Sequence, residues 1–200
     1  IAVVCGPCAG GAAYSPALMD FVIMTRKNSH MFLTGPEVIK AVTGRTTTMA
    51  EVGSAEMHAS VSGNVHFLAE DDQNAIDLVK RILSFLPPNN TEDPPHDLSA
   101  EIDDTPDPGM DELIPDSPTD PLDMQAIIRR LVDNGEILEV HASFARNVIV
   151  GFARFCGVIV GIVANQPMVM AGALDLNAAD KVARFVRTCN VFNIPLVTLV

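Results

Sequence analysis

The segment 87–123 constrains the fold more than any other feature of this sequence, because it separates two apolar regions by a stretch that is unsuited to a core. It is rich in proline and contains no Lys or Arg. Its acidic residues are Glu92, Asp93, Asp97, Glu101, Asp103, Asp104, Asp107, Asp111, Glu112, Asp116, Asp120 and Asp123. Like charges keep such a segment solvated, and each proline removes an N–H group that helices and sheets need. We therefore predict two domains, at residues 1–86 and 121–200, joined by an acidic linker at residues 87–120.

The first predicted domain mixes short strands with helices, which is typical of the α/β class. Apolar and β-branched runs predict strands at residues 1–4, 21–24, 31–33 and 65–68. Three signals predict helices: Pro36 followed by Gly44, the Thr48-x-x-Glu51 capping pattern, which Gly53 ends, and Asp71 or Asp72 ahead of an apolar stripe of Ile76, Val79, Ile82 and Leu83.

The second predicted domain has the same mixture. A helix is expected to start at Asp120-Pro121 and to end at Gly135. Residues 148–155 and 158–164 are expected to form a hairpin that turns at Cys156-Gly157. A further helix, capped by Asn177, is predicted to bury Val182, Phe185, Val186 and Cys189 and to expose Lys181, Arg184 and Arg187.

The composition argues against two classes of function. The net charge of −12 and the scattered Lys and Arg residues argue against a nucleic-acid surface, which needs clustered basic residues. No apolar run approaches the roughly 18 residues that cross a bilayer, so we expect no membrane insertion. The four cysteines lie beside apolar residues, which indicates a reducing compartment, the cytoplasm or the mitochondrial matrix. Because the chain opens at Ile1 and closes within an apolar run, we expect a fragment of a longer protein.

The pair Gly10-Gly11 lies between a predicted strand and a predicted helix. The first N–H groups of a helix lack internal acceptors, and the helix dipole there favours negative charge. Without side chains in the way, a substrate carbonyl can approach such donors closely and form an oxyanion hole. Close packing at a turn is the alternative explanation, and the dipeptide alone favours it. Gly172-Ala173 precedes another capped helix and predicts a second turn with exposed N–H groups.

The motif Cys5-Gly6-Pro7-Cys8 is typical of redox dithiols, whose thiol pKa is lowered. No Trp precedes it and a glycine pair follows it, so two small apolar residues in a buried turn are the favoured interpretation. The spacing from Gly6 to Gly11 matches the start of a phosphate-binding loop. Ala12-Ala13 stand where that loop needs Lys and Ser or Thr, which argues against a nucleotide site.

Two other kinds of site have weak support. His58 and His66 flank Ser62, as in a hydrolase triad, but no Gly-x-Ser-x-Gly elbow surrounds the serine. The cysteine pair finds no second pair at zinc spacing, so we expect no metal site in this segment.

Five stretches of the chain resemble, in order, the carboxyltransferase (beta) subunits of biotin-dependent acyl-CoA carboxylases of the propionyl-CoA type. They are residues 6–18 (GPCAGGAAYSPAL), 32–36 (FLTGP), 147–154 (NVIVGFAR), 161–167 (GIVANQP) and 183–187 (ARFVR). The first two resemble the N-domain of that family, and the other three resemble the opening of its C-domain. Only the acidic linker and parts of the early helices match loosely.

The resemblance implies a fold and a reaction. It implies an α/β fold with two crotonase-like domains of the ClpP/crotonase superfamily, both incomplete in this fragment, in a homo-oligomer that is a hexamer of beta subunits. The implied reaction transfers a carboxyl group from carboxybiotin to the α carbon of a short-chain acyl-CoA, with propionyl-CoA giving methylmalonyl-CoA. In that family the ureido group of biotin takes the Cα proton after releasing its carboxyl group, so the cofactor does the proton chemistry. The fragment is expected to be inactive alone.

The resemblance also implies the site residues and the partners. The N–H groups of Gly10, Gly11 and Ala12 would hold the thioester enolate oxygen, and Tyr14 would contact the substrate. In the other domain, Gly172 and Ala173 would contribute to the biotin side. The sequence has no Ala-Met-Lys-Met biotinylation motif, so biotin would arrive on a biotin carboxylase or biotin carboxyl carrier subunit.

Other functions remain open at this point. The carboxyltransferase subunit of a sodium-pumping methylmalonyl-CoA decarboxylase, or of a transcarboxylase, would look nearly identical over this segment. From other classes, a thiol-disulfide redox protein would use Cys5 and Cys8, and an oligomerisation scaffold would carry no chemistry.

Overall fold

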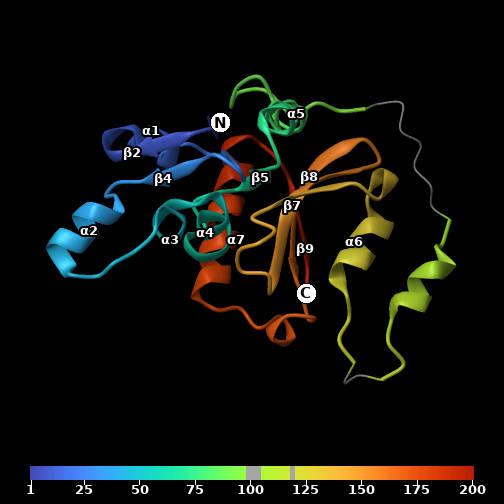
Figure 1. The fold of residues 1–200 in the computed structure, drawn as a ribbon. Coiled ribbons are helices and arrows are strands. Elements are labelled where there is room, and N and C mark those ends of the chain that lie inside the picture. The colour runs from blue at the N-terminus through green and yellow to red at the C-terminus, as the bar shows by residue number, and fades with distance from the viewer. Residues whose placement is uncertain (98–104, 118–119) are drawn as a thin grey trace. The chain divides into compact units, whose positions relative to one another are not determined.

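The computed structural model describes residues 1–97, 105–117 and 120–200 (Figure 1). It divides into two compact units: the first contains Ile1–Arg81 and His141–Phe144, and the second contains Ile82–Val140 and Ala145–Val200. Parts of the predicted linker, residues 98–104 and 118–119, lie outside the described residues. A described part contains a short 3-10 helix, η3 (Pro108–Leu113), which starts at a proline in a position where the missing N–H is not needed.

Two small parallel sheets form the frame of the first unit. One has the order β1 (Ala2–Val4), β3 (Val22–Thr25), β5 (Phe67–Ala69), and the other pairs β2 (Pro7–Ala9) with β4 (His30–Phe32). The four strands predicted in this region are confirmed. Strand β2 was not predicted, because Gly6 and Pro7 favour a turn and only the pairing with β4 extends the chain there. Val4, Val22, Met24, Met31 and Val65 lie in the core of this unit.

The helices of the first unit are short and begin and end at recognisable residues. They are η1 (Gly10–Ala13), α1 (Tyr14–Ala17), α2 (Pro36–Thr43), α3 (Met49–Gly53), α4 (Ala55–Met57) and a π-helical turn, η2 (His58–Ser62). Gly44 ends α2 in the left-handed conformation, with φ 72°. The predicted capping box is confirmed: Thr48 N–H donates to Glu51 Oε2 at 2.7 Å, and Glu51 N–H donates to Thr48 Oγ1 at 3.2 Å.

Helix α5 (Asp72–Leu83) corrects one prediction. Asp71 caps it, since Asp71 Oδ1 accepts the N–H of Asn74 at 2.8 Å. The predicted apolar stripe is wrong in part, because Ile76 and Leu83 are 50% and 54% exposed whereas Ala75 and Ile82 are fully buried. The stripe of buried residues lies next to the predicted stripe on the helix surface. Tertiary packing, rather than the spacing of apolar residues in the sequence, decides which of the two stripes is buried.

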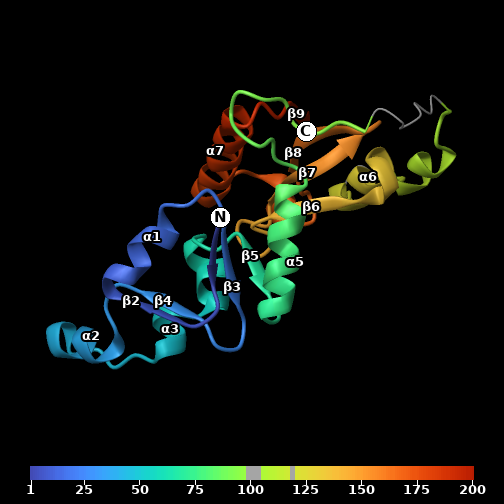
Figure 2. The same ribbon diagram turned by 90° about the horizontal axis from the view of Figure 1, so that it is seen from above.

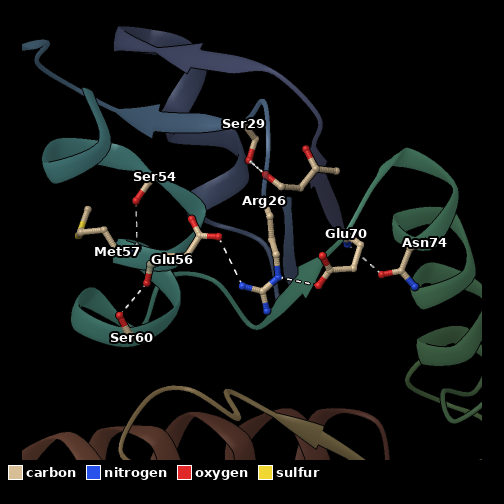
Figure 3. Close-up of polar contacts among 9 residues, drawn as sticks. Arg26, Ser29, Ser54, Glu56, Met57, Ser60, Glu70 and Asn74 are labelled. Carbon is tan, nitrogen blue, oxygen red and sulfur yellow. Dashed lines mark hydrogen bonds and ion pairs between the residues drawn. The ribbon is translucent and has the colours of Figure 1, made fainter. Parts of the chain in front are cut away.

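Arg26 ties the end of β3 to two other elements of the first unit (Figure 3). Its guanidinium donates from Nε to Glu70 Oε1 at 2.7 Å and from Nη1 to Glu56 Oε1 at 3.4 Å. Nearby, the Ser29 hydroxyl donates to the Thr25 carbonyl. The ion pairs are partly exposed, so they fix geometry more than they add stability.

The second unit contains a four-stranded sheet in the order β6 (Ile137–Val140), β7 (Val148–Phe155), β8 (Val158–Asn165), β9 (Leu196–Leu199). The first three strands are antiparallel neighbours, and β9 is parallel to β8. The hairpin at Cys156-Gly157 is confirmed, with φ of 49° and 78°. Strand β6 was not predicted, because its alternating pattern is short and follows Asn134-Gly135 closely.

Helices α6 (Met124–Leu131) and α7 (Leu176–Val191) lie on opposite faces of this sheet (Figures 1 and 2). Ile128 of α6 packs in a cluster with Val160 and Ile162 of β8. Between them, Gly161 faces the other helix, since a Cβ at Gly161 would lie 2.6 Å from Cys189 Sγ of α7. Because helices cover both faces of this sheet, side chains on both faces of its central strands are buried. This explains why the sequences of these strands are apolar without alternation.

The starts of both helices differ from the predictions. Helix α6 is capped by Asp123 rather than starting at Asp120-Pro121, and α7 is capped by Asp175 rather than by Asn177. The Asp175 carboxylate accepts the N–H of Ala178 at 2.9 Å. Several residues in each region are good caps, and the choice between them depends on the tertiary structure. In the part of the chain that the structure covers, no helix is long and apolar enough to cross a bilayer.

Asp133 holds the β7–β8 turn, and its removal is expected to destabilise the protein. Its two carboxylate oxygens accept the N–H groups of Cys156 at 2.8 Å and Gly157 at 2.7 Å. We expect Asp133→Ala to lower the free energy of unfolding by about 2 kcal/mol, because hydrogen bonds to a charged group contribute more than neutral ones. Chemical denaturation measures this, with the exposed Asp116→Ala as the control. Equal stability of the two variants would contradict the assignment.

Lys181 in α7 was predicted to face solvent, and this prediction is wrong. Its side chain is buried, with 1% exposed. The ammonium donates to the carbonyl of Val148 at 2.8 Å and to that of Ala145 at 3.3 Å. Burial lowers the pKa of Lys181 to about 8, although the charge of Glu139 raises it. Lys181 follows Ala178 by three residues and precedes Phe185 by four, and both are buried, so its helical phase is that of the buried face and only its charge suggested exposure.

Stability is expected to rise with pH through Lys181. Between pH about 8 and 10.5, the unfolded chain holds the lysine proton and the folded chain releases it, so raising the pH favours the folded state. The full effect is roughly 3 kcal/mol. Denaturant unfolding of the wild type and of Lys181→Met at pH 7.5 and pH 10 measures it. The stability of the wild type relative to the variant is expected to rise at pH 10, and a constant difference would count against the shift.

Candidate active site

The predicted oxyanion residues lie where β2 ends and η1 begins. Gly10 takes the left-handed conformation, with φ 62°, and turns the chain out of the strand. Gly11 and Ala12 are exposed, and Tyr14, the first residue of α1, is 61% exposed. The structure therefore places Gly10, Gly11, Ala12 and Tyr14 together on one open turn.

The three N–H groups of this turn differ in their access. In a 3-10 helix each N–H donates to the carbonyl three residues earlier, so Ala12 has the carbonyl of Ala9 as its acceptor. The N–H of Gly11 precedes the first such bond and has no helical acceptor. The N–H of Gly10 continues the parallel ladder between β2 and β4, in which Ala9 lies opposite Phe32, so the carbonyl of Phe32 is its acceptor. A Cβ at Gly11 would meet nothing within 4 Å, whereas one at Gly10 would reach the carbonyl oxygen of Leu33 at 4.0 Å. Gly11 is therefore the donor with the most open surroundings.

Strand β4 lies beside the strand that leads into this turn. It pairs with β2 through Cys8 opposite Met31 and Ala9 opposite Phe32. The carbonyl oxygen of Met31 accepts a hydrogen bond from His58 Nε2 at 2.6 Å. Gly53 of α3 packs directly against the same carbonyl, where there is no room for a side chain. The position of the turn therefore depends on how closely His58 and Gly53 pack against β4.

The histidines do not form the triad that their spacing suggested. Ser62 Oγ lies 2.8 Å from His58 Nδ1, one helical turn away. His66 belongs to a different contact: its Nδ1 accepts the N–H of Val22 at 3.0 Å, and its ring lies 4.2 Å from that of His141. His58 and Ser62 are thus brought together, and His66 is not part of that pair.

The cysteine pair lacks the properties of a redox dithiol. Cys8 lies within the extended strand β2 rather than at the start of a helix. Cys5 is exposed as a residue, yet partial burial of its thiol raises the thiol pKa, and the Asp72 carboxylate raises it further. A redox-active cysteine needs a lowered pKa. The interpretation of these residues as a dithiol centre therefore has no support in the structure.

The second predicted turn is built differently from the first. The N–H of Gly172 donates to Val169 at 2.9 Å, and the N–H of Ala173 donates to Met170 at 3.0 Å. The prediction that these N–H groups are exposed is therefore wrong, because the turn closes on itself. The turn includes the 3-10 helix η5 (Met170–Gly172).

Side-chain amides hold this second turn from outside. Asn165 Nδ2 donates to the carbonyl of Gly172 at 3.1 Å, and Asn147 Nδ2 donates to that of Ala173 at 2.7 Å. Sequence reasoning did not single out either asparagine. The available signal was an amide at the very start or end of an apolar strand run. Among residues 1–97, 105–117 and 120–200, no group of three or more His, Cys, Asp or Glu side chains is placed to hold a metal ion.

Comparison with known proteins assigns this arrangement to a family. The carboxyl transferase domain profile matches residues 1–200, and the chain belongs to the carboxyl transferase domain family. The chain is also similar to the solved transcarboxylase 12S structure with bound methylmalonyl-coenzyme A, at 52% identity and a TM-score of 0.94, over 99% of this chain and 38% of that one. The predicted α/β, crotonase-like fold is confirmed.

Two curated relatives have similar identities. The chain is 51% identical to the propionyl-CoA carboxylase beta chain of Saccharopolyspora erythraea, over 100% of this chain and 38% of that protein. It is 50% identical to the methylmalonyl-CoA decarboxylase subunit alpha of Veillonella parvula, over 100% of this chain and 39% of that protein. The chain thus spans less than half the length of these relatives. The division at residues 1–86, 87–120 and 121–200 stays a prediction.

Proposed function

We propose that the full-length protein is a carboxyltransferase component that moves a carboxyl group between carboxybiotin and the α carbon of a short-chain acyl-CoA. Propionyl-CoA and methylmalonyl-CoA are the proposed pair, because the names of the relatives refer to one or the other. The observation that carries the proposal is the exposed position of Gly11 at the start of η1, where its N–H has no helical acceptor, within the stretch that resembles the family's signature.

Gly11 would act on the thioester carbonyl of the acyl-CoA. Removing the Cα proton moves negative charge onto the carbonyl oxygen, and a fixed N–H donor stabilises that charge by about 3 kcal/mol. Gly10 and Ala12 would shape the same turn, and Tyr14 would contact the acyl-CoA. Biotin, carried by a partner subunit, would supply both the carboxyl group and the base.

The turn at Gly172-Ala173 does not fit a donor site for the biotin carbonyl, because both N–H groups are used within the turn. We propose these two residues as van der Waals contacts on the biotin side, without a hydrogen-bonding role. Proposed partners are the acyl-CoA, a biotin carboxylase or biotin carboxyl carrier subunit, and further copies of the same subunit in a hexamer. The proposed compartment is the cytoplasm or the mitochondrial matrix.

The half-reaction tests the proposal. The full-length protein, incubated with methylmalonyl-CoA and biotin, is expected to form propionyl-CoA only when biotin is present. Biotin-independent turnover, or no turnover with any short-chain acyl-CoA, would contradict it. Because a decarboxylase subunit is about as similar as a carboxylase subunit, purification with the native partners then separates the two: a membrane subunit indicates the decarboxylase, and a biotin carboxylase indicates the carboxylase.

A further inference from the structure

The turn between β8 and α7 holds an unfavourable backbone. Met170, Ala171 and Gly172 are successive residues in the left-handed region, with φ of 52°, 52° and 73°. Each non-glycine residue there costs roughly 1 to 2 kcal/mol, so the surrounding structure must stabilise the turn. The side chains of Met168 and Met170 are 55% and 61% exposed, so they do not anchor it in a core.

Asn147 is the main contact that holds the turn at its α7 end. It donates to the carbonyl of Ala173 at 2.7 Å and to Asp175 Oδ1 at 3.3 Å. The main-chain carbonyl of Asn147 accepts the N–H of Gln166 at 3.0 Å, at the other end of the turn. Asn147 is 2% exposed, so water does not replace these bonds readily. Both ends of the turn are therefore fixed by one residue.

Lys181 fixes the main chain on both sides of Asn147. Its ammonium binds the carbonyls of Val148 and Ala145, the residues that bracket Asn147 closely. Ala145 is itself left-handed, with φ 43°, so this segment also needs support. The charge of Glu139 in β6 acts on Lys181. The charges of Arg129 and Arg146 act on Glu139 in turn.

We propose that Lys181 is a positioning residue for the turn at residues 166–175: by holding the carbonyls around Asn147, it keeps that side chain under Ala173 and Asp175. A buried ammonium adds little net stability compared with an apolar residue of the same size. The proposed role of Lys181 is to hold this turn in a single backbone conformation. The consequence for catalysis rests on the proposed function, because only there does this turn contact the biotin side.

Hydrogen exchange tests the geometric step without any assay of activity. The N–H groups of Gly172 and Ala173 are bonded within the turn and report directly on its order. In the assembled full-length protein, Lys181→Met is expected to speed their exchange roughly tenfold while the amides of β8 keep their protection. Lys80→Met makes the same change at an exposed lysine of α5 and is expected to alter neither. Asn147→Ala is expected to reproduce the Lys181→Met pattern.

Unchanged exchange at Gly172 and Ala173 in Lys181→Met would overturn the proposal, as would equal acceleration over the whole second unit. If Lys181→Met does not assemble, Lys181→Leu, which also removes the donor, is measured in the same way and is held to the same two outcomes. In the half-reaction, Lys181→Met is expected to raise KM for biotin several-fold and to leave KM for methylmalonyl-CoA unchanged. A wild-type protein without turnover refutes the proposed function, and the exchange result still decides the role of Lys181.

Discussion

Gly11→Val is expected to lower kcat/KM for carboxyl transfer by about 10² to 10³, because the valine side chain would occupy the space through which a thioester oxygen reaches the Gly11 N–H. The fold is expected to tolerate the change. A Cβ at Gly11 meets nothing within 4 Å, and the backbone there is not left-handed. Steady-state kinetics of the full-length enzyme measure the loss, and sedimentation shows that the oligomer still forms.

Gly6→Val is the matched control for this prediction. A Cβ at Gly6 would also meet nothing within 4 Å, and Gly6 lies outside η1. The variant is expected to keep activity within a few-fold of the wild type. Similar losses in both variants would mean that any bulk near β2 disturbs the region, and the specific role of Gly11 would then be refuted.

Gly53→Ala is expected to cause the largest loss of stability, about 3 kcal/mol. A Cβ at Gly53 would collide with the main-chain carbonyl of Met31 and would lie 2.8 Å from Phe32 Cδ1. A carbonyl in a strand cannot move aside as a side chain end can, so β4 must shift. Because β2 pairs with β4, activity is expected to fall together with thermal stability.

The contrast with Gly6→Ala makes this prediction specific. Gly6→Ala adds the same methyl group in the same unit and meets no neighbour within 4 Å. It is expected to change the free energy of unfolding by less than about 0.5 kcal/mol. A Gly53→Ala protein as stable as Gly6→Ala would show that α3 and β4 are not packed as described.

Local signals in the sequence predicted the elements whose ends are set by nearby residues. Pro36 and Gly44 bound α2, Thr48 and Glu51 form the capping box, and Cys156-Gly157 makes the hairpin turn. In each case the side chain or the backbone preference acts within a few residues. The boundaries of these elements can therefore be predicted from the local sequence.

Elements that depend on distant partners were predicted poorly. Strand β2 exists through its pairing with β4, and the choice of Asp175 over Asn177 as a cap depends on where α7 meets the sheet. Lys181 lies on the buried face of α7, between Ala178 and Phe185, and the carbonyls of Ala145 and Val148 explain how a lysine is accommodated there. Periodicity gives no access to partners more than thirty positions away.

The candidate site was predicted unevenly for the same reason. Resemblance to a family pointed to Gly10, Gly11 and Ala12, and the 3-10 geometry now separates them, with Gly11 as the open donor. The same reasoning gave Gly172 and Ala173 exposed N–H groups, which the structure uses internally. A glycine followed by a small residue indicates a turn, but the direction of its N–H groups depends on backbone angles that the letters do not specify.

Isotope-edited infrared spectroscopy tests the central claim most directly. Propionyl-CoA labelled with ¹³C at the thioester carbonyl is bound to the full-length protein, and the carbonyl band is compared with its position in water. We predict a shift to lower frequency in the wild type and in Gly6→Val, because the Gly11 N–H polarises the bond, and no such shift in Gly11→Val. A fully bound wild-type substrate whose carbonyl band stays at its aqueous position would contradict the account.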